Sequence, residues 1–167
     1  DATVNIDLSN TKSKINSKEF KKFVKFKNFS LQNQDITFAS ENLINFKLNK
    51  KNEIKNFSIK SKLKSESILI DYKSQRIKKY FSDFKNQIKF SNSFLDLDYK
   101  NKKFTFNLKS KYSINNINEN ISLNVEKKDN NYFFDLDLDL DSAEIDIEEL
   151  DYRKKADIKS NLNMNGI

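Results

Sequence analysis

The residues most suited by type and spacing to binding or catalysis lie in an acidic run from Asp135 to Asp151. Counting from Asp137, carboxylates fall at positions one, three and five, and Glu148 falls at position twelve, as in a helix–loop–helix calcium loop. Two other positions do not fit, because Ser142 stands where the sharp turn needs Gly and Glu144 stands where an apolar residue is usual. We therefore do not expect a calcium site, and we expect no bound metal elsewhere.

The first part of this run, Asp135 to Asp141, alternates strictly between Asp and Leu, which is the pattern of a half-buried β-strand. On such a strand the carboxylates would line a solvated face. They could pair across strands with the abundant lysines, each pair contributing about 0.2–1 kcal/mol. The carboxylates concerned are Asp135, Asp137, Asp139 and Asp141.

Catalytic chemistry has little support in the composition. The chain has no His and no Cys, so it has neither an imidazole base nor a thiol nucleophile. Its one Gly, Gly166, cannot form a glycine-rich phosphate loop. Paired carboxylates could hydrolyse glycosides, but no apolar pocket is evident that would raise the pKa of one of them. We expect no enzyme activity, no catalytic residues and no cofactor.

The net charge of +7 comes from lysine far more than arginine. Lys, Asn, Ile and Phe are residues that AT-rich codons favour. A protein that reads nucleic acid would use more Arg, whose planar guanidinium binds phosphate and guanine in a bidentate way. We therefore expect no nucleic-acid partner, although a basic nucleic-acid-binding module remains a third hypothesis.

Short runs that alternate apolar with polar residues extend through the whole chain, and each predicts a strand with one apolar and one polar face. The predicted strands span residues 2–8, 24–31, 35–39, 43–49, 54–63, 67–73, 87–91, 94–100, 103–113, 120–127, 132–141, 144–149 and 156–165.

The breaks between these runs are polar and rich in Asn, which tolerates positive φ better than other non-Gly residues. Residues 99–104 predict a tight hairpin, and residues 125–133 predict a hairpin with a longer loop. Short links make successive strands antiparallel neighbours. The prediction is an all-β antiparallel meander of about 10–13 strands in a single unit, residues 1–167.

Two stretches depart from the period of two. Between Ser74 and Lys85, apolar residues recur at spacings of three and four, which predicts one short amphipathic helix near 75–85. Residues 17–23 could form a second helical turn or continue a strand. We expect both to plug an open end of the core, and the alternative is a gate or an element that touches a membrane. The apolar positions of the first stretch are Ile77, Tyr80, Phe81 and Phe84.

The apolar face of the predicted sheet is either an ordinary core or a surface for acyl chains, and periodicity alone does not separate the two. A meander of this kind can close as a barrel, fold into a sandwich, or curl into an open groove. For the groove, the predicted lipid-binding residues are Phe46, Leu48, Phe57, Ile59, Leu63, Ile68, Ile70, Leu95, Leu97, Phe104, Phe106, Leu108, Ile121, Leu123, Val125, Leu136, Leu138 and Leu140.

Three sequence segments share a pattern of a short apolar strand, a polar turn and a strand of similar length. They span residues 26–31, 35–41 and 56–63. In this pattern the chain resembles the AsmA-like bacterial envelope proteins, a group that includes YhdP and TamB. The resemblance implies a β-taco-like groove on the periplasmic side of the inner membrane of a Gram-negative bacterium. It also implies bridge-like transfer of phospholipid between membranes, and it brings no catalytic residues.

The chain starts within alternating sequence, at Val4, Ile6 and Leu8, and we expect it to be a segment of a longer protein. Its expected partners are phospholipid acyl chains, neighbouring β-segments of the same chain, and a membrane reached through an anchor outside the segment. The alternative function is a plain β-sandwich or barrel that serves as an envelope interaction module without a ligand.

Overall fold

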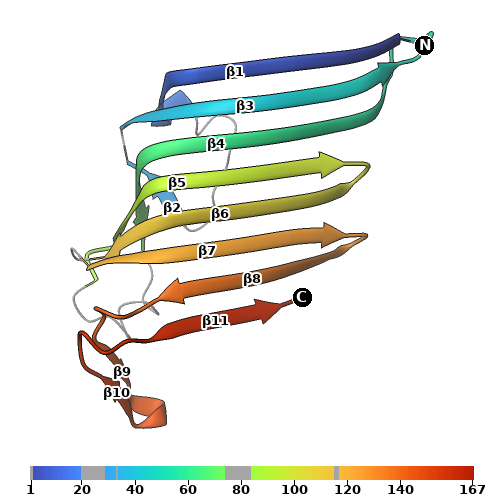
Figure 1. Ribbon diagram of the computed structural model, residues 1–167. Helices are drawn as coiled ribbons and strands as arrows, with labels where there is room; N and C mark the ends of the chain where they lie inside the picture. Colours follow the sequence, from blue (N-terminus) through green and yellow to red (C-terminus); the bar gives the residue numbers. More distant parts are fainter. Residues whose placement is uncertain (1, 20–28, 33, 74–83, 115–116) are drawn as a thin grey trace.

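The computed structural model describes residues 2–19, 29–32, 34–73, 84–114 and 117–167, and every structural statement below concerns these residues. They include eleven strands and one 3₁₀ turn (Figure 1). The elements are β1 (Ala2–Asn16), β2 (Phe29–Leu31), β3 (Asp35–Leu48), β4 (Ile54–Tyr72), β5 (Gln87–Lys100), β6 (Lys103–Ile114), β7 (Ile117–Lys128), β8 (Asn131–Asp139), β9 (Ile145–Ile147), η1 (Glu148–Leu150), β10 (Tyr152–Lys154) and β11 (Asn161–Gly166).

Nine of these strands form one antiparallel sheet in the order β1-β3-β4-β5-β6-β7-β8-β11, with β2 paired to the end of β4. The remaining two, β9 and β10, follow β8 and precede β11 in the sequence, and they form a small separate hairpin. The large sheet is open, because β1 and β11 lie at opposite edges and do not pair with each other (Figure 1). The predicted all-β antiparallel meander is confirmed, whereas a closed barrel is not what these residues form.

The eleven strands fall within the predicted number, but several are longer than predicted because three pairs of predicted strands are continuous. The predicted strands 35–39 and 43–49 merge into β3, which ends at Leu48, and 54–63 and 67–73 merge into β4, which ends at Tyr72. The predicted strands 87–91 and 94–100 merge into β5. The polar residues between the runs stay in the hydrogen-bonded ladder. In β5 the irregularity at Asn92, with φ 51°, is a bulge against β6. At about 3.3 Å per residue, the 19 residues of β4 extend for about 60 Å.

Asparagine supplies much of the turn geometry in this chain, as expected. Five of the nine non-Gly residues with positive φ among the described residues are Asn. Between β5 and β6 the hairpin turns on Asn101 (φ 50°) and Lys102 (φ 67°), as predicted. Between β7 and β8 only residues 129–130 lie outside the ladder, because Lys128 pairs with Asn131. The prediction of a longer loop there was wrong.

The buried apolar residues gather at one end of the sheet, where β4 and β5 curve and β2 joins (Figure 1). We call this region the packed end. Phe84, the last residue of the predicted helical stripe, is buried there in non-helical backbone, while residues 74–83 lie outside the described residues. Of the other predicted turn, residues 17–19 are helical and residues 20–23 lie outside the description. The buried apolar residues are Leu31, Ile36, Phe84, Tyr112, Leu140 and Ala143.

Buried polar groups join the packed end to the β9–β10 hairpin. The Tyr112 hydroxyl donates to the backbone oxygen of Asp139, and the Glu119 carboxylate accepts from the backbone N–H of Ser142 at 2.6 Å. Lys154, which is 3% exposed, donates to two backbone oxygens of residues 141 and 143, each at 2.8 Å. Burial, followed by the nearby charges of Glu119 and Asp139, raises the pKa of Tyr112 well above its ordinary range.

The β5–β6 turn provides a test of this backbone account. Because Lys102 holds a positive φ that only Gly adopts without strain, Lys102→Gly is expected to raise the free energy of unfolding by about 1 kcal/mol. Urea denaturation of the two proteins measures the difference. In the control, Lys103→Gly, the substitution falls within β6 and lowers stability by about 0.5–1 kcal/mol. A loss of stability in both variants would contradict the assigned turn.

The raised pKa of Tyr112 predicts a stability change in alkali. The folded state favours the neutral phenol, so unfolding releases a proton once the pH passes the ordinary tyrosine pKa of about 10. The wild-type protein is therefore expected to lose stability above about pH 10 more steeply than Tyr112→Phe. Urea denaturation across this pH range measures the slopes, with the exposed Tyr132→Phe as control. Equal slopes for Tyr112→Phe and wild type would refute the assignment.

Candidate functional site

The register of the sheet places apolar side chains in rows that cross the strands. Leu63 lies opposite Leu95, which lies opposite Leu108, and the same alignment continues through β7, β8 and β11. With strands about 4.8 Å apart, these six positions extend for about 24 Å. We call them the leucine row: Leu63, Leu95, Leu108, Leu123, Leu136 and Met164.

A second row lies beside the first, two residues along each strand. Its members, the aromatic row, are Leu97, Phe106, Val125 and Phe134 on β5 to β8. On β11 the position opposite Phe134 is Gly166, where a Cβ atom would lie 2.6 Å from the ring carbon Cε1 of Phe134. The single glycine of the chain therefore leaves room for that ring.

Most of the predicted lipid-binding residues share this face of the sheet. A third row continues across β3 to β6 as Ile44, Ile59, Tyr99 and Phe104, and the rings of Phe57 and Tyr99 lie 6.0 Å apart. Three of the predicted residues, Ile68, Ile70 and Leu140, lie instead at the packed end. The predicted residues on the common face are Phe46, Leu48, Phe57, Ile59, Leu63, Leu95, Leu97, Phe104, Phe106, Leu108, Ile121, Leu123, Val125, Leu136 and Leu138.

This apolar face is half-exposed along the rows. No member of the leucine or aromatic row is buried, and Phe134 and Met164 are 40% and 43% exposed. In the described part of the chain, the strands of the large sheet make their main contacts with their neighbours in that sheet. Away from the packed end, the described residues thus form a single layer without a second sheet against the rows.

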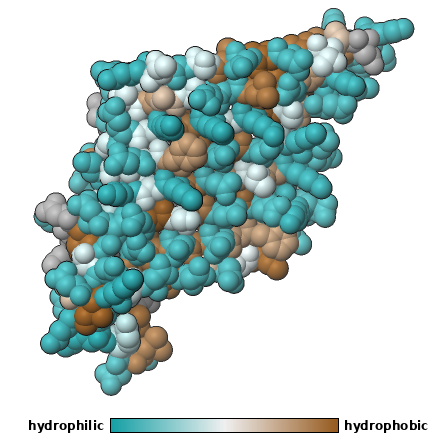
Figure 2. All heavy atoms as spheres, in the orientation of Figure 1, coloured by the Kyte–Doolittle hydropathy of each residue, from teal (hydrophilic) through white to brown (hydrophobic). Residues whose placement is uncertain are grey.

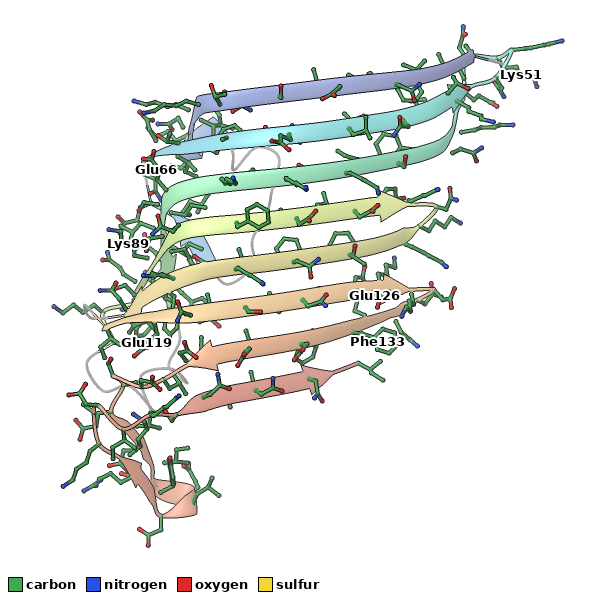
Figure 3. The ribbon with its side chains drawn as sticks, viewed as in Figure 1. Lys51, Glu66, Lys89, Glu119, Glu126 and Phe133 are labelled. Atoms are coloured by element: carbon green, nitrogen blue, oxygen red, sulfur yellow. The ribbon has the colours of Figure 1, made fainter. Side chains whose placement is uncertain are left out.

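The opposite face is hydrophilic, as Figure 2 shows for the side seen in Figure 1. Lysines of β4 lie opposite acids of β5, with Lys60 Nζ 3.4 Å from Asp98 Oδ2 and Lys62 opposite Asp96. The basic residues of β4 therefore have acidic neighbours. Figure 3 labels two other residues of this polar face that lie opposite each other on β7 and β8, Glu126 and Phe133.

The carboxylates of Asp135, Asp137 and Asp139 lie on the polar face of β8, which confirms this part of the strand predicted for the acidic run. Asp141 falls beyond the end of β8, in a turn where its Oδ1 accepts a hydrogen bond from the backbone N–H of Ser160 at 2.7 Å, so its predicted place on the strand was wrong.

The cross-strand neighbours of the three β8 carboxylates are not lysines, however. Asp135 lies opposite Asn124 and Asn165, and Asp137 has serine and asparagine neighbours. Asp139 accepts a hydrogen bond from Asn120 Nδ2 at 2.7 Å. The prediction of lysine partners was wrong here, because lysines of the neighbouring strands fall in other registers.

A polar cluster interrupts the apolar face, and sequence analysis missed it. It consists of Asn10, Ser40, Asn42 and Ser61 on β1, β3 and β4, joined by side-chain hydrogen bonds. Ser40 and Asn42 fall in the break between two predicted strands, and Asn10 lies beyond the end of another, whereas Ser61 lies inside the predicted strand 54–63. Counting the strand parity through from Ile44 and Ile59 would have placed them on the apolar face.

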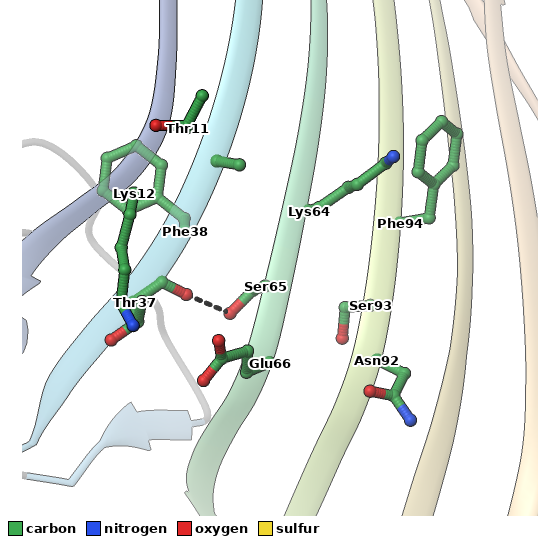
Figure 4. A pocket seen from close by; sticks show the side chains of 11 residues that line it. Thr11, Lys12, Thr37, Phe38, Lys64, Ser65, Glu66, Asn92, Ser93 and Phe94 are labelled. Atoms are coloured by element: carbon green, nitrogen blue, oxygen red, sulfur yellow. Dashed lines mark hydrogen bonds between the residues drawn. The ribbon is translucent and has the colours of Figure 1, made fainter.

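A separate hollow of about 440 Å³ lies where the register shifts, over β1, β3, β4 and β5 (Figure 4). Ser65 Oγ donates to the backbone oxygen of Thr37 at 3.1 Å, and Lys64 Nζ lies 5.9 Å from the Phe94 ring centre. Its lining mixes charged, polar and aromatic side chains without a convergent set of donors or acceptors. The rows of the apolar face are therefore the stronger candidate site.

The described residues contain neither a metal-binding cluster nor a membrane-spanning helix. Within the described ranges, no three acidic side chains converge to hold a metal ion. The same residues include no helix with the length and apolar character needed to cross a bilayer.

No protein-family model, curated protein sequence or solved structure matches this chain.

Proposed function

We propose that this chain is a non-enzymatic lipid-binding segment, in which the apolar face of the sheet forms part of a β-taco-like groove for phospholipid. The observation that carries the proposal is the half-exposed leucine row on a single-layer sheet. Soluble proteins seldom leave a large contiguous apolar surface exposed unless it contacts a ligand, a membrane or another protein.

The dimensions of the leucine row suit an acyl chain. A bilayer has a hydrocarbon core of about 30 Å for two leaflets, so one extended chain occupies about 15 Å. The row of about 24 Å is long enough to hold it. Each methylene that leaves water gains about 0.8 kcal/mol when fully buried and correspondingly less on an open face.

The repetition of the rows suits transfer more than storage. Leucine recurs at matching positions on β4 to β8, so a chain displaced by one strand meets similar surface. Both edge strands leave one side of their backbone without a partner among the described residues. Neighbouring β-segments of the same protein would extend the face there. An envelope setting, on the periplasmic side of an inner membrane with an anchor outside this segment, fits such a bridge.

The second candidate is an envelope interaction module without a ligand. The observation that favours it is the exposed apolar tip of the β9–β10 hairpin, where Leu150 is 72% exposed and Tyr152 is 48% exposed. Such a module would use this tip and would not need the leucine row.

A charge placed in the leucine row tests the lipid-binding proposal. Leu108→Asp removes an apolar side chain from the middle of the row and adds a carboxylate that an acyl chain would desolvate. The affinity for a fluorescent phosphatidylcholine is expected to fall at least tenfold, or about 1.4 kcal/mol. Fluorescence titration measures the change.

The matched control is Asn107→Asp, which adds the same charge at the neighbouring position on the polar face. Its affinity is expected to stay within about twofold of wild type, which corresponds to less than 0.5 kcal/mol. Circular dichroism checks that both variants keep their strands. Equal affinity in the two folded variants would refute binding on the leucine row and favour the interaction module.

A further inference from the structure

Both rows change from apolar to polar at the same side of the sheet. The leucine row ends at Leu63 on β4, and the next positions, on β3 and β1, are Ser40 and Asn10. The aromatic row starts at Leu97 on β5 and is followed on β4 and β3 by Ser61 and Asn42. A long apolar stretch followed at once by a polar patch has the polarity profile of an amphiphile.

The polar patch is a connected hydrogen-bond network. Asn10 Nδ2 and Asn42 Nδ2 both donate to Ser40 Oγ, at 2.6 and 3.0 Å, and Ser61 Oγ donates to Asn42 Oδ1 at 2.6 Å. Asn10 Oδ1 is buried and has no partner among the described residues. Ser40 is also buried, whereas Asn42 and Ser61 are half-exposed and place amide and hydroxyl groups next to the apolar surface.

None of the four side chains carries a charge, so the network suits a neutral hydrogen-bonding group more than a phosphate or an ammonium. Where an acyl chain joins its polar end in a glycerolipid, ester carbonyls accept hydrogen bonds and a free glycerol hydroxyl donates them. Asn and Ser side chains match both functions.

We propose that the polar cluster binds the glycerol–ester region of a glycerolipid whose acyl chain lies along the leucine or aromatic row. This inference rests on the proposed function and fixes the direction of the bound lipid. The chain extends from β4 toward β11, and the glycerol lies over β3 and β4. Either a neutral acylglycerol or a phospholipid would supply this chemistry.

The test replaces two members of the cluster with apolar residues of similar size, in the double variant Asn42→Leu with Ser61→Val. Three ligands that carry the same hydrocarbon chain are compared by displacement of a fluorescent fatty acid: monomyristoylglycerol, myristoyl lysophosphatidylglycerol and tetradecane. The variant is expected to bind the two esters about tenfold more weakly, as for the loss of one or two hydrogen bonds, and tetradecane with unchanged affinity.

The control makes the same two replacements on the polar face, Asn124→Leu with Ser122→Val on β7, and is expected to bind all three ligands like wild type. A tenfold loss for both esters supports recognition of the shared glycerol–ester region. A loss for monomyristoylglycerol alone supports a neutral acylglycerol as the ligand.

Other outcomes overturn the inference. If the variant binds the esters as tightly as wild type does, or loses esters and tetradecane alike, the cluster does not recognise the glycerol region. If wild type binds tetradecane as tightly as the esters, the inference fails while the lipid-binding function stands. If none of the three ligands displaces the probe from the wild-type protein, the proposed function fails as well.

Discussion

The structure depends on the alignment of side-chain alternation between strands. Side chains alternate between the two faces along each strand, and the hydrogen-bond register keeps this alternation in step from one strand to the next. A slip of one residue between β6 and β7 would move Leu123 from the apolar to the polar face. Because the register holds from β4 to β8, leucines far apart in the sequence form one row. The polar face follows from the same alignment, which places Lys62 opposite Asp96.

The packed end and the rest of the sheet are stabilised in different ways. At the packed end, Leu31 and Phe84 are almost fully buried, and this region provides the ordinary tertiary core. Along the rest of the strands, stability comes chiefly from the backbone ladder and from cross-strand pairs on both faces. The leucine row therefore stays half-exposed, which is the condition that a bound acyl chain would satisfy.

Alternation in the sequence was enough to predict the all-β meander, the tight β5–β6 turn and the common face shared by residues such as Phe106 and Leu123. It could not show that β3, β4 and β5 continue through polar positions, because an isolated Ser or Asn in a strand resembles a turn. For the same reason the cluster around Ser40 and Asn42 was missed. Lysine partners for Asp135 were predicted wrongly, since cross-strand neighbours depend on register, which composition does not reveal.

The central claim is that an acyl chain contacts the apolar face and not the polar face. Site-specific photo-crosslinking tests it most directly, with p-benzoylphenylalanine in place of Leu108 or Leu123 on one face, and of Asn107 or Asn124 on the other. After illumination with phospholipid vesicles, mass spectrometry identifies the adducts. The account predicts phospholipid adducts at positions 108 and 123 and none at 107 and 124. Adducts on both faces alike, or on neither, would contradict it.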